Sequence, residues 1–121
     1  MQFGDCAVGV AGAAVRGTQI VSRQLSLDDR WRFIVTVPDI ELATAEARRV
    51  LPTSVSLHDA TTNLGALALL IAGLANSDEW SVHAMDDALH QPYRMPLLPF
   101  AAPLLATLRE AGAAGTCWSG A

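Results

Sequence analysis

The stretch HDATTNLGALALLIAGLA, from His58 to Ala75, has the strongest helical pattern in the chain. Apolar residues recur in it at the spacing of one helix face, and we predict a helix over Leu57–Leu74. Its longest apolar run, Leu64 to Ala75, has about a dozen residues, whereas a membrane-spanning helix needs about 20. We therefore interpret this helix as the buried core of a globular domain, and we predict no membrane partner.

Two stretches before this helix alternate in the way that β-strands do. Trp31 to Val37 (WRFIVTV) alternates strongly and Val15 to Leu25 alternates weakly. We predict that these two strands form an antiparallel hairpin, with a turn at Leu27–Arg30 between them. The small apolar residues from Asp5 to Val15 indicate a short, tightly packed helix that leads into the first strand.

Other stretches complete the predicted α+β fold. Capping residues, Pro52 and Gly112 indicate where further helices begin and end. The predicted helices are Thr44–Val50, Asp78–Leu89 and Ala101–Ala111, followed by a short buried strand at Gly115–Ser119, and the prolines at 92, 96 and 99 indicate an ordered loop. We expect two layers, an antiparallel sheet of three strands with helices on one face.

The composition limits the class of protein. With 121 residues, the chain has the size of one domain, and 51% hydrophobic against 17% charged residues excludes a disordered tail. The net charge of −4 argues against a nucleic-acid partner, which would need clustered basic residues. All eight basic residues are arginine, so the chain has no lysine for a Walker-type phosphate site or a Schiff base.

The cysteines and the first residues indicate a reduced, cytoplasmic protein. Cys6 and Cys117 lie near opposite ends without the CxxC spacing of a zinc site, and two cysteines make no disulfide framework. The N-terminus lacks the basic and apolar regions of a signal peptide. Cys117 beside Trp118 has two interpretations, a nucleophile or a small buried strand cysteine, and the second is favoured because no histidine lies at a telling offset.

Two groups of polar residues are candidates for binding. His83, Asp86, Asp87 and His90 include three that would share one helix face, which fits either a metal site or a solvated face, and we assign no metal. Arginines beside caps and prolines often hold a carboxylate or phosphate with two hydrogen bonds. Such arginines here are Arg48, Arg49 and Arg94, with an unpartnered surface position as the alternative.

Three segments, taken in order, resemble a known family. They are VPDIELATAEARRVLP (Val37–Pro52), HQPYRMPLLP (His90–Pro99) and GAAGTCWSGA (Gly112–Ala121), and Asn63 lies early in the long helix between the first two. This arrangement resembles the homoserine kinases, a branch of the GHMP small-molecule kinases. The resemblance covers nearly the whole chain, and it implies one domain, residues 1–121, like the ferredoxin-like C-terminal domain of that family.

The resemblance implies a substrate site but no catalytic residue. Asp5 matches an acidic position in the substrate pocket, although Cys6 stands where the family has asparagine and Phe3-Gly4 where it has histidine. The other positions implied are Thr44 and Arg48 for the amino-acid substrate, Arg94 for its carboxylate, and Gly115, Ser119 and Gly120 in a glycine motif beside nucleotide and substrate.

The family's reaction is the transfer of a phosphoryl group from ATP, with Mg²⁺, to the hydroxyl of homoserine in threonine biosynthesis. The Gly/Ser-rich loop that holds the ATP phosphates belongs to an N-terminal domain, and its pattern is absent from these residues. We therefore expect the chain to supply the substrate side and to be inactive alone, without its own cofactor. The alternative is a stand-alone, non-catalytic module that binds an amino acid or dimerises.

We also expect a homodimer. The family continues past the glycine motif with at least one more strand, so an edge of the predicted sheet would be left uncovered here. Unpaired edge groups are a template for pairing with another chain. A monomer whose N-terminal segment covers this edge is the alternative.

Overall fold

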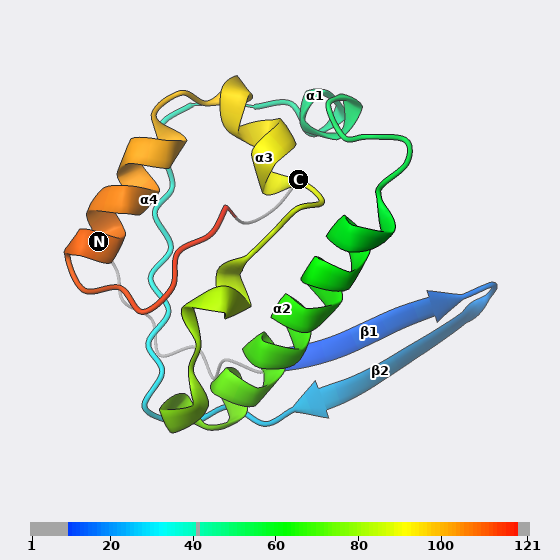
Figure 1. Cartoon of the computed structure of the whole chain (residues 1–121), viewed down its shortest axis with the longest axis vertical. Helices are drawn as coiled ribbons and strands as arrows, with labels where there is room; N and C mark the ends of the chain where they lie inside the picture. Colours follow the sequence, from blue (N-terminus) through cyan, green and yellow to red (C-terminus); the bar gives the residue numbers. More distant parts are fainter. Residues whose placement is uncertain (1–9, 41, 119–121) are drawn as a thin grey trace.

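The structure is a computed structural model that describes residues 10–40 and 42–118, with side chains described from residue 17 onward. Within these residues, helices predominate and the strands form one hairpin (Figure 1). The elements are β1 (Val10–Arg16), β2 (Gln19–Leu25), α1 (Thr44–Arg49), α2 (Leu57–Ala75), α3 (Gln91–Arg94) and α4 (Ala101–Glu110), with short 3₁₀ helices η1 (Ser77–Glu79), η2 (Val82–Met85) and η3 (Met95–Leu97).

Helix α2 lies where the sequence predicts it, but its prediction as a buried core helix is wrong. Leu57, Leu64 and Leu67 are 82%, 66% and 51% exposed, because neighbouring elements cover only part of its surface. Ser56 caps α2, because its hydroxyl oxygen accepts a hydrogen bond from the Asp59 N–H at 3.0 Å. Ala66 and Gly73 are its buried residues, and η1 and η2 pack against it. By length and composition alone α2 is also able to cross a membrane, but this is weak evidence, since core helices of soluble proteins meet the same criterion.

Two tryptophans pack around the C-terminal end of α2. The Trp31 and Trp80 rings meet edge to face, with centroids 4.8 Å apart. The Trp31 Nε1–H donates to the carbonyl of Gly73 at 2.9 Å, and Trp80 Nε1–H donates to the carbonyl of Ala114 at 2.9 Å. A Cβ built on Gly73 or on Gly115 would lie under 3.0 Å from the Trp80 ring. This tryptophan cluster therefore joins the loop after β2, helix α2 and the C-terminal segment.

An ion-pair network joins the loop after β2 to η1. The Asp28 carboxylate accepts hydrogen bonds from Arg30 and from the Ser77 N–H, and Arg30 also reaches Asp78 at 2.9 Å. The Arg30 side chain and then the Ser77 N–H hold the pKa of Asp28 well below its usual range. The backbone N–H of Asp28 donates to the carbonyl of Leu74 at 2.8 Å. The chain after β2 is thus bound at the end of α2.

The predicted hairpin has the wrong partner strand. β1 pairs antiparallel with β2, from Val10↔Leu25 to Arg16↔Gln19, around Gly17 with φ +60°. A two-residue turn whose glycine accepts positive φ closes the shortest possible loop, which favours this local pairing. Residues 10–15 are accordingly strand instead of helix, and residues 5–9 lie outside the described part of the chain.

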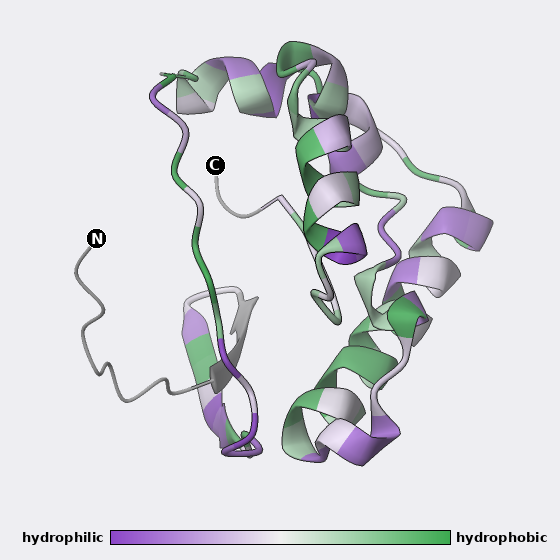
Figure 2. Cartoon of the chain, turned by 90° about the vertical axis from the view of Figure 1, so that its left-hand side faces the viewer, coloured by the Kyte–Doolittle hydropathy of each residue, from purple (hydrophilic) through white to green (hydrophobic). Residues whose placement is uncertain are grey.

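The segment Trp31–Val37 is extended but forms no strand ladder, so its prediction as a strand is wrong. The Trp31 side chain is turned toward α2, and the loop is held there by Asp28. Figure 1 shows this segment running toward α1 while the hairpin projects away from the helices, and Figure 2 shows the segment set apart from the helices. Strand-like alternation is satisfied only when a neighbouring strand is available. The predicted three-stranded sheet is therefore absent from the described residues.

Helices α1, α2 and α4 lie where the sequence predicts them, whereas three other predictions are wrong. Residues 78–89 form 3₁₀ turns and loop, because the Ser81 and Asp87 side chains accept backbone N–H groups that a helix over these residues would use. The proline-rich stretch contains α3 and η3, since proline is accepted in the first turn of a helix. Residues 115–118 form no strand.

The two glycines of α2 give a matched test of the tryptophan cluster. Gly73→Ala places its Cβ 2.8 Å from Trp80 Cε3 and 3.2 Å from Trp80 Cα, and we expect a loss of about 1–3 kcal/mol of unfolding free energy. Gly65→Ala meets no atom within 4 Å, and we expect a gain of about 0.5–1 kcal/mol from helix propensity. Urea unfolding measures both, and equal gains would contradict the close packing of Trp80.

Candidate functional site

Asp87 organises the start of α3. Its carboxylate accepts hydrogen bonds from the backbone N–H groups of Leu89 at 2.8 Å and Gln91 at 2.8 Å, and it pairs with His90 Nδ1 at 2.6 Å. Asn63 of α2 donates to the same carboxylate at 3.1 Å and accepts the N–H of residue 88 at 2.8 Å. Because its side chain is only 7% exposed, Asp87 forms a buried link between α2 and α3.

The environment of Asp87 lowers the pKa of its carboxyl group. Burial by itself would raise this pKa, but hydrogen bonds from Gln91, Leu89, Asn63 and His90 stabilise the charged form and lower the pKa from 3.8 to about 2. Asp87 is therefore a permanent anion at neutral pH. The charged Asp87 carboxylate accepts the N–H groups of Leu89 and His90, just before α3, and of Gln91, its first residue.

Helix α3 also holds the C-terminal segment. The Gln91 side-chain oxygen accepts the backbone N–H of Trp118 at 2.9 Å. Arg94 is at the other end of the same helix and is half-buried. Gly115 lies against Trp80, and its Cβ would also come within 2.9 Å of the Met85 sulfur. The described part of the glycine motif is thus fixed on both sides, by α3 and by the tryptophan cluster.

An open cavity of about 540 Å³ lies beside this segment. Its size falls in the range of small-molecule sites, and apolar side chains provide most of its lining. Helix α3 and the glycine motif both contribute to it. The lining residues are Val82, His83, Met85, Asp86, Asp87, Gln91, Pro92, Met95, Ala102, Leu105, Arg109, Ala114, Gly115 and Thr116.

The structure places the predicted site residues in two groups. Arg94 and Gly115 belong to the assembly of α3 and the C-terminal segment described above. Thr44 and Arg48 are exposed on α1, which lies at the same end of the molecule as α3 (Figure 1). The predicted positions Asp5, Cys6, Ser119 and Gly120 lie outside the described residues.

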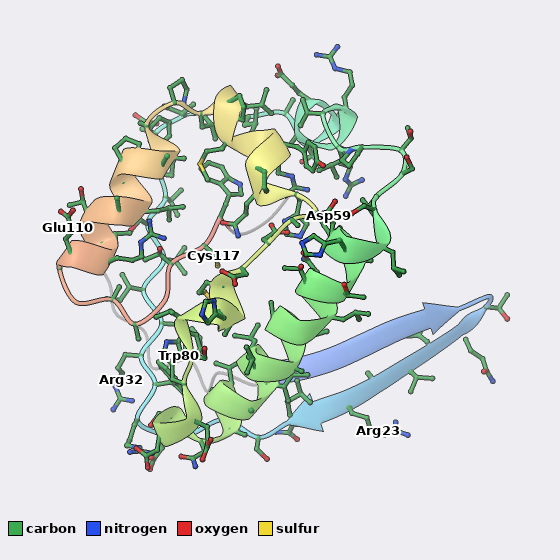
Figure 3. The ribbon with its side chains drawn as sticks, viewed as in Figure 1. Arg23, Arg32, Asp59, Trp80, Glu110 and Cys117 are labelled. Atoms are coloured by element: carbon green, nitrogen blue, oxygen red, sulfur yellow. The ribbon has the colours of Figure 1, made fainter. Side chains whose placement is uncertain are left out.

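Two other candidates differ from their predicted settings. The stretch from His83 to His90 is no continuous helix, and it forms two separate pairs, His83–Asp86 at 3.0 Å and His90–Asp87. Across residues 10–40 and 42–118, no three His, Cys, Asp or Glu side chains converge as metal ligands. Cys117 is a free, exposed thiol (Figure 3), so its interpretation as a buried strand cysteine is wrong.

Sequence reasoning missed the roles of Asp87 and Gln91. The available signal was an acidic residue four positions before Gln91-Pro92, because proline in the first turn marks a helix start and an upstream carboxylate can bind its free N–H groups. The link from Gln91 to Trp118 spans 27 positions. Nothing in local sequence indicates so distant a contact.

Neighbouring aspartates provide a matched test of this link. We expect Asp87→Asn to lower the unfolding free energy by about 1–3 kcal/mol at pH 7, because buried N–H groups lose a charged acceptor. We expect Asp86→Asn to cost less than about 0.5 kcal/mol, because Asp86 is 52% exposed and pairs with an exposed histidine.

The pH dependence of the Asp87 effect has a defined sign. A folded pKa of about 2, below the ordinary 3.8, gives stability that is fully present above about pH 4 and is lost as the pH falls through 2. The difference between wild type and Asp87→Asn therefore shrinks between pH 4 and pH 2. Chemical denaturation across this range measures it, and a difference that grows toward low pH would refute the assignment.

Comparisons with known proteins point to one family. No family model matches the chain. The homoserine kinase of Moorella thermoacetica is 40% identical over 113 residues, which cover 93% of this chain and 38% of that protein. The homoserine kinase of Gloeobacter violaceus is 39% identical over 116 residues, covering 95% of this chain and 39% of that protein.

A solved structure agrees with these sequence matches. The crystal structure of homoserine kinase from Cytophaga hutchinsonii matches with a TM-score of 0.68 and 25% identity, over 79% of this chain and 31% of that one. The chain thus spans less than two fifths of the length of the curated relatives named above. By sequence and by structure, the chain is a homologue of part of the homoserine kinases.

Proposed function

We propose that this chain is the substrate-side, C-terminal part of a cytoplasmic homoserine kinase, which transfers the γ-phosphoryl group of ATP to the homoserine hydroxyl. The support is the identity to proteins named homoserine kinase together with one structural observation. Helix α3 carries both Arg94 and Gln91, and Gln91 holds the segment that contains Gly115. The carboxylate-binding and glycine positions of the family resemblance therefore occur in one connected assembly.

In this proposal, the chain's residues bind and orient the amino acid. The Arg94 guanidinium offers a planar pair of donors for the substrate carboxylate, and its half-buried setting strengthens such a contact. Arg48 and Thr44, on α1, add a second cation and a hydroxyl for the same substrate. These groups position the hydroxyl for attack, which is how phosphoryl transfer is promoted on the substrate side.

ATP and Mg²⁺ belong, in this proposal, to the remainder of the kinase. The described residues bring together no three metal-binding side chains, and the sequence has neither a lysine nor a Gly/Ser-rich phosphate loop. These residues do not fit the nucleotide phosphates or the metal, so we derive no step through them. The chain alone is then inactive, and a non-catalytic amino-acid-binding module is the alternative.

A graft tests the proposal directly. The 113 matched residues of the Moorella thermoacetica homoserine kinase are replaced by the corresponding residues of this chain, and ADP release with homoserine is measured. We expect activity from the graft and none from the isolated chain. Arg94→Ala in the graft should lower kcat/KM at least about tenfold, because a charge-assisted hydrogen bond is lost.

The control for this experiment is Arg49→Ala, which removes an exposed arginine from α1. It should leave kcat/KM within about twofold of the parent graft, as surface substitutions usually do. A folded but inactive graft, or equal effects of the Arg94 and Arg49 substitutions, would contradict the proposal. Turnover by the isolated chain would contradict its inactivity.

We also propose that the isolated chain forms a homodimer through residues 33–37. Ile34, Val35 and Val37 are 84%, 81% and 82% exposed, and Phe33 is also exposed. This extended segment has the alternation of a strand, and no backbone hydrogen bond joins residues 33–37 to another of the described residues. A second copy of the same segment supplies a complementary strand by two-fold symmetry.

Light scattering at micromolar concentrations tests this assembly. We expect a mass near twice 12.8 kDa for the wild type, and a monomer for Val35→Lys, because a charge at the centre of the paired segment opposes pairing. Ile20→Lys, on the exposed hairpin, is the control and should remain dimeric. A monomeric wild type, or the same loss of dimer in both variants, would refute the assignment of this surface.

A further inference from the structure

A chain of hydrogen bonds runs from helix α2 to the glycine motif through Gln91. Asn63 of α2 donates to the Asp87 carboxylate at 3.1 Å, and this carboxylate accepts the Gln91 backbone N–H at 2.8 Å. The Gln91 side-chain oxygen then accepts the Trp118 N–H at 2.9 Å. Each link is at least partly buried, so water competes little for these groups.

The backbone and the side chain of Gln91 bind different partners. The Asp87 bond holds its N–H, while the first turn of α3 fixes the direction of its side chain. A partly buried N–H without an acceptor costs free energy. The C-terminal segment is therefore stabilised in the position where the Trp118 N–H donates to the Gln91 side-chain oxygen. The C-terminal segment is thereby tied to α3, 27 positions earlier in the sequence.

The same helix carries Arg94. Gln91 and Arg94 are the first and last residues of α3, three positions apart, so their side chains leave neighbouring parts of one helix face. Any movement of α3 therefore carries the arginine and the C-terminal segment together. The distance between Arg94 and the C-terminal segment is set by one turn of α3 and by one hydrogen bond from Trp118 to Gln91.

We propose that Gln91 is a positioning residue, which holds the glycine motif in place beside Arg94. This role rests on the proposed function, in which Arg94 binds the homoserine carboxylate and the motif lies beside substrate and nucleotide. In this proposal, Gln91 acts through the segment that it holds and not by contact with substrate or nucleotide. Its side-chain oxygen sets where the backbone of residues 115–118 lies relative to the arginine, and so sets the shape of the site for a small amino acid.

The hydrogen bond from the Trp118 N–H to the Gln91 side chain is called the tether below. Amide hydrogen exchange of the 121-residue chain tests it without any ligand. In Gln91→Leu, the Trp118 amide loses its acceptor and should exchange about two- to tenfold faster than in the wild type. Gln91→Glu keeps an acceptor oxygen, now charged, and should restore protection to at least the wild-type level. Gln24→Leu, on the exposed strand β2, is the matched control and should leave the Trp118 amide unchanged.

Two further amides separate a lost tether from a melted helix. The N–H groups of Tyr93 and Arg94 bond to the His90 carbonyl at 3.1 Å, so they report on α3 itself. We expect their exchange to be unchanged in Gln91→Leu. Unchanged exchange at Trp118 in Gln91→Leu would overturn the proposal, as would Gln91→Glu exchanging as fast as Gln91→Leu. Equal acceleration at all three amides would overturn it too, since Gln91 would then only stabilise α3.

Homoserine titration by calorimetry connects the tether to the substrate. If the tether shapes the site, Gln91→Leu weakens homoserine binding and Gln91→Glu restores it. Equal affinity in wild type and Gln91→Leu, with the Trp118 amide released, would show that the tether has no part in binding. A wild-type chain without homoserine affinity counts against the proposed function, whereas the exchange result decides the tether by itself.

Discussion

Trp80 fits between two glycines, and the arrangement of the chain depends on this fit. Its ring lies so close to Gly73 and Gly115 that neither position has room for a Cβ. Its indole N–H is bonded to Ala114, and its ring meets Trp31 edge to face. Among the described residues, most of the buried core side chains are alanines, so this aromatic cluster supplies packing that the small core lacks. Losing it would leave the C-terminal segment connected to α2 through α3.

The elements that sequence predicts correctly are those whose signals are local. Helix α2 has a long apolar periodicity and a serine cap, and α4 ends at Glu110, two residues before Gly112 with φ +99°. The segment Trp31–Val37 has an equally clear strand pattern, but a strand also needs a neighbour, and β2 pairs instead across the tight turn at Gly17. Periodicity predicts which side chains of a segment would face each side of a sheet. It does not reveal whether a sheet is there.

The candidate site shows the same division. The motif residue Arg94 was identified through family resemblance, and the structure places it on α3 with Gln91. Asp87 accepts the Gln91 N–H across 4 positions, a spacing that local sequence can indicate. Asn63 accepts the N–H of residue 88 across 25 positions, and such a contact appears only in three dimensions. Thr44 and Arg48 stay exposed on a short helix, so their part in the site remains a prediction from resemblance.

Helix α2 links the two assemblies because it carries a contact residue for each. Asn63 reaches the start of α3, and Gly73, ten positions later, receives Trp80. With a rise of about 1.5 Å and a turn of about 100° per residue, the helix keeps these contacts about 15 Å apart and at a fixed angle. Adding or removing one residue between them would swing one contact a quarter turn from its partner. The number of residues between Asn63 and Gly73 therefore constrains the fold more than the identity of the exposed side chains there.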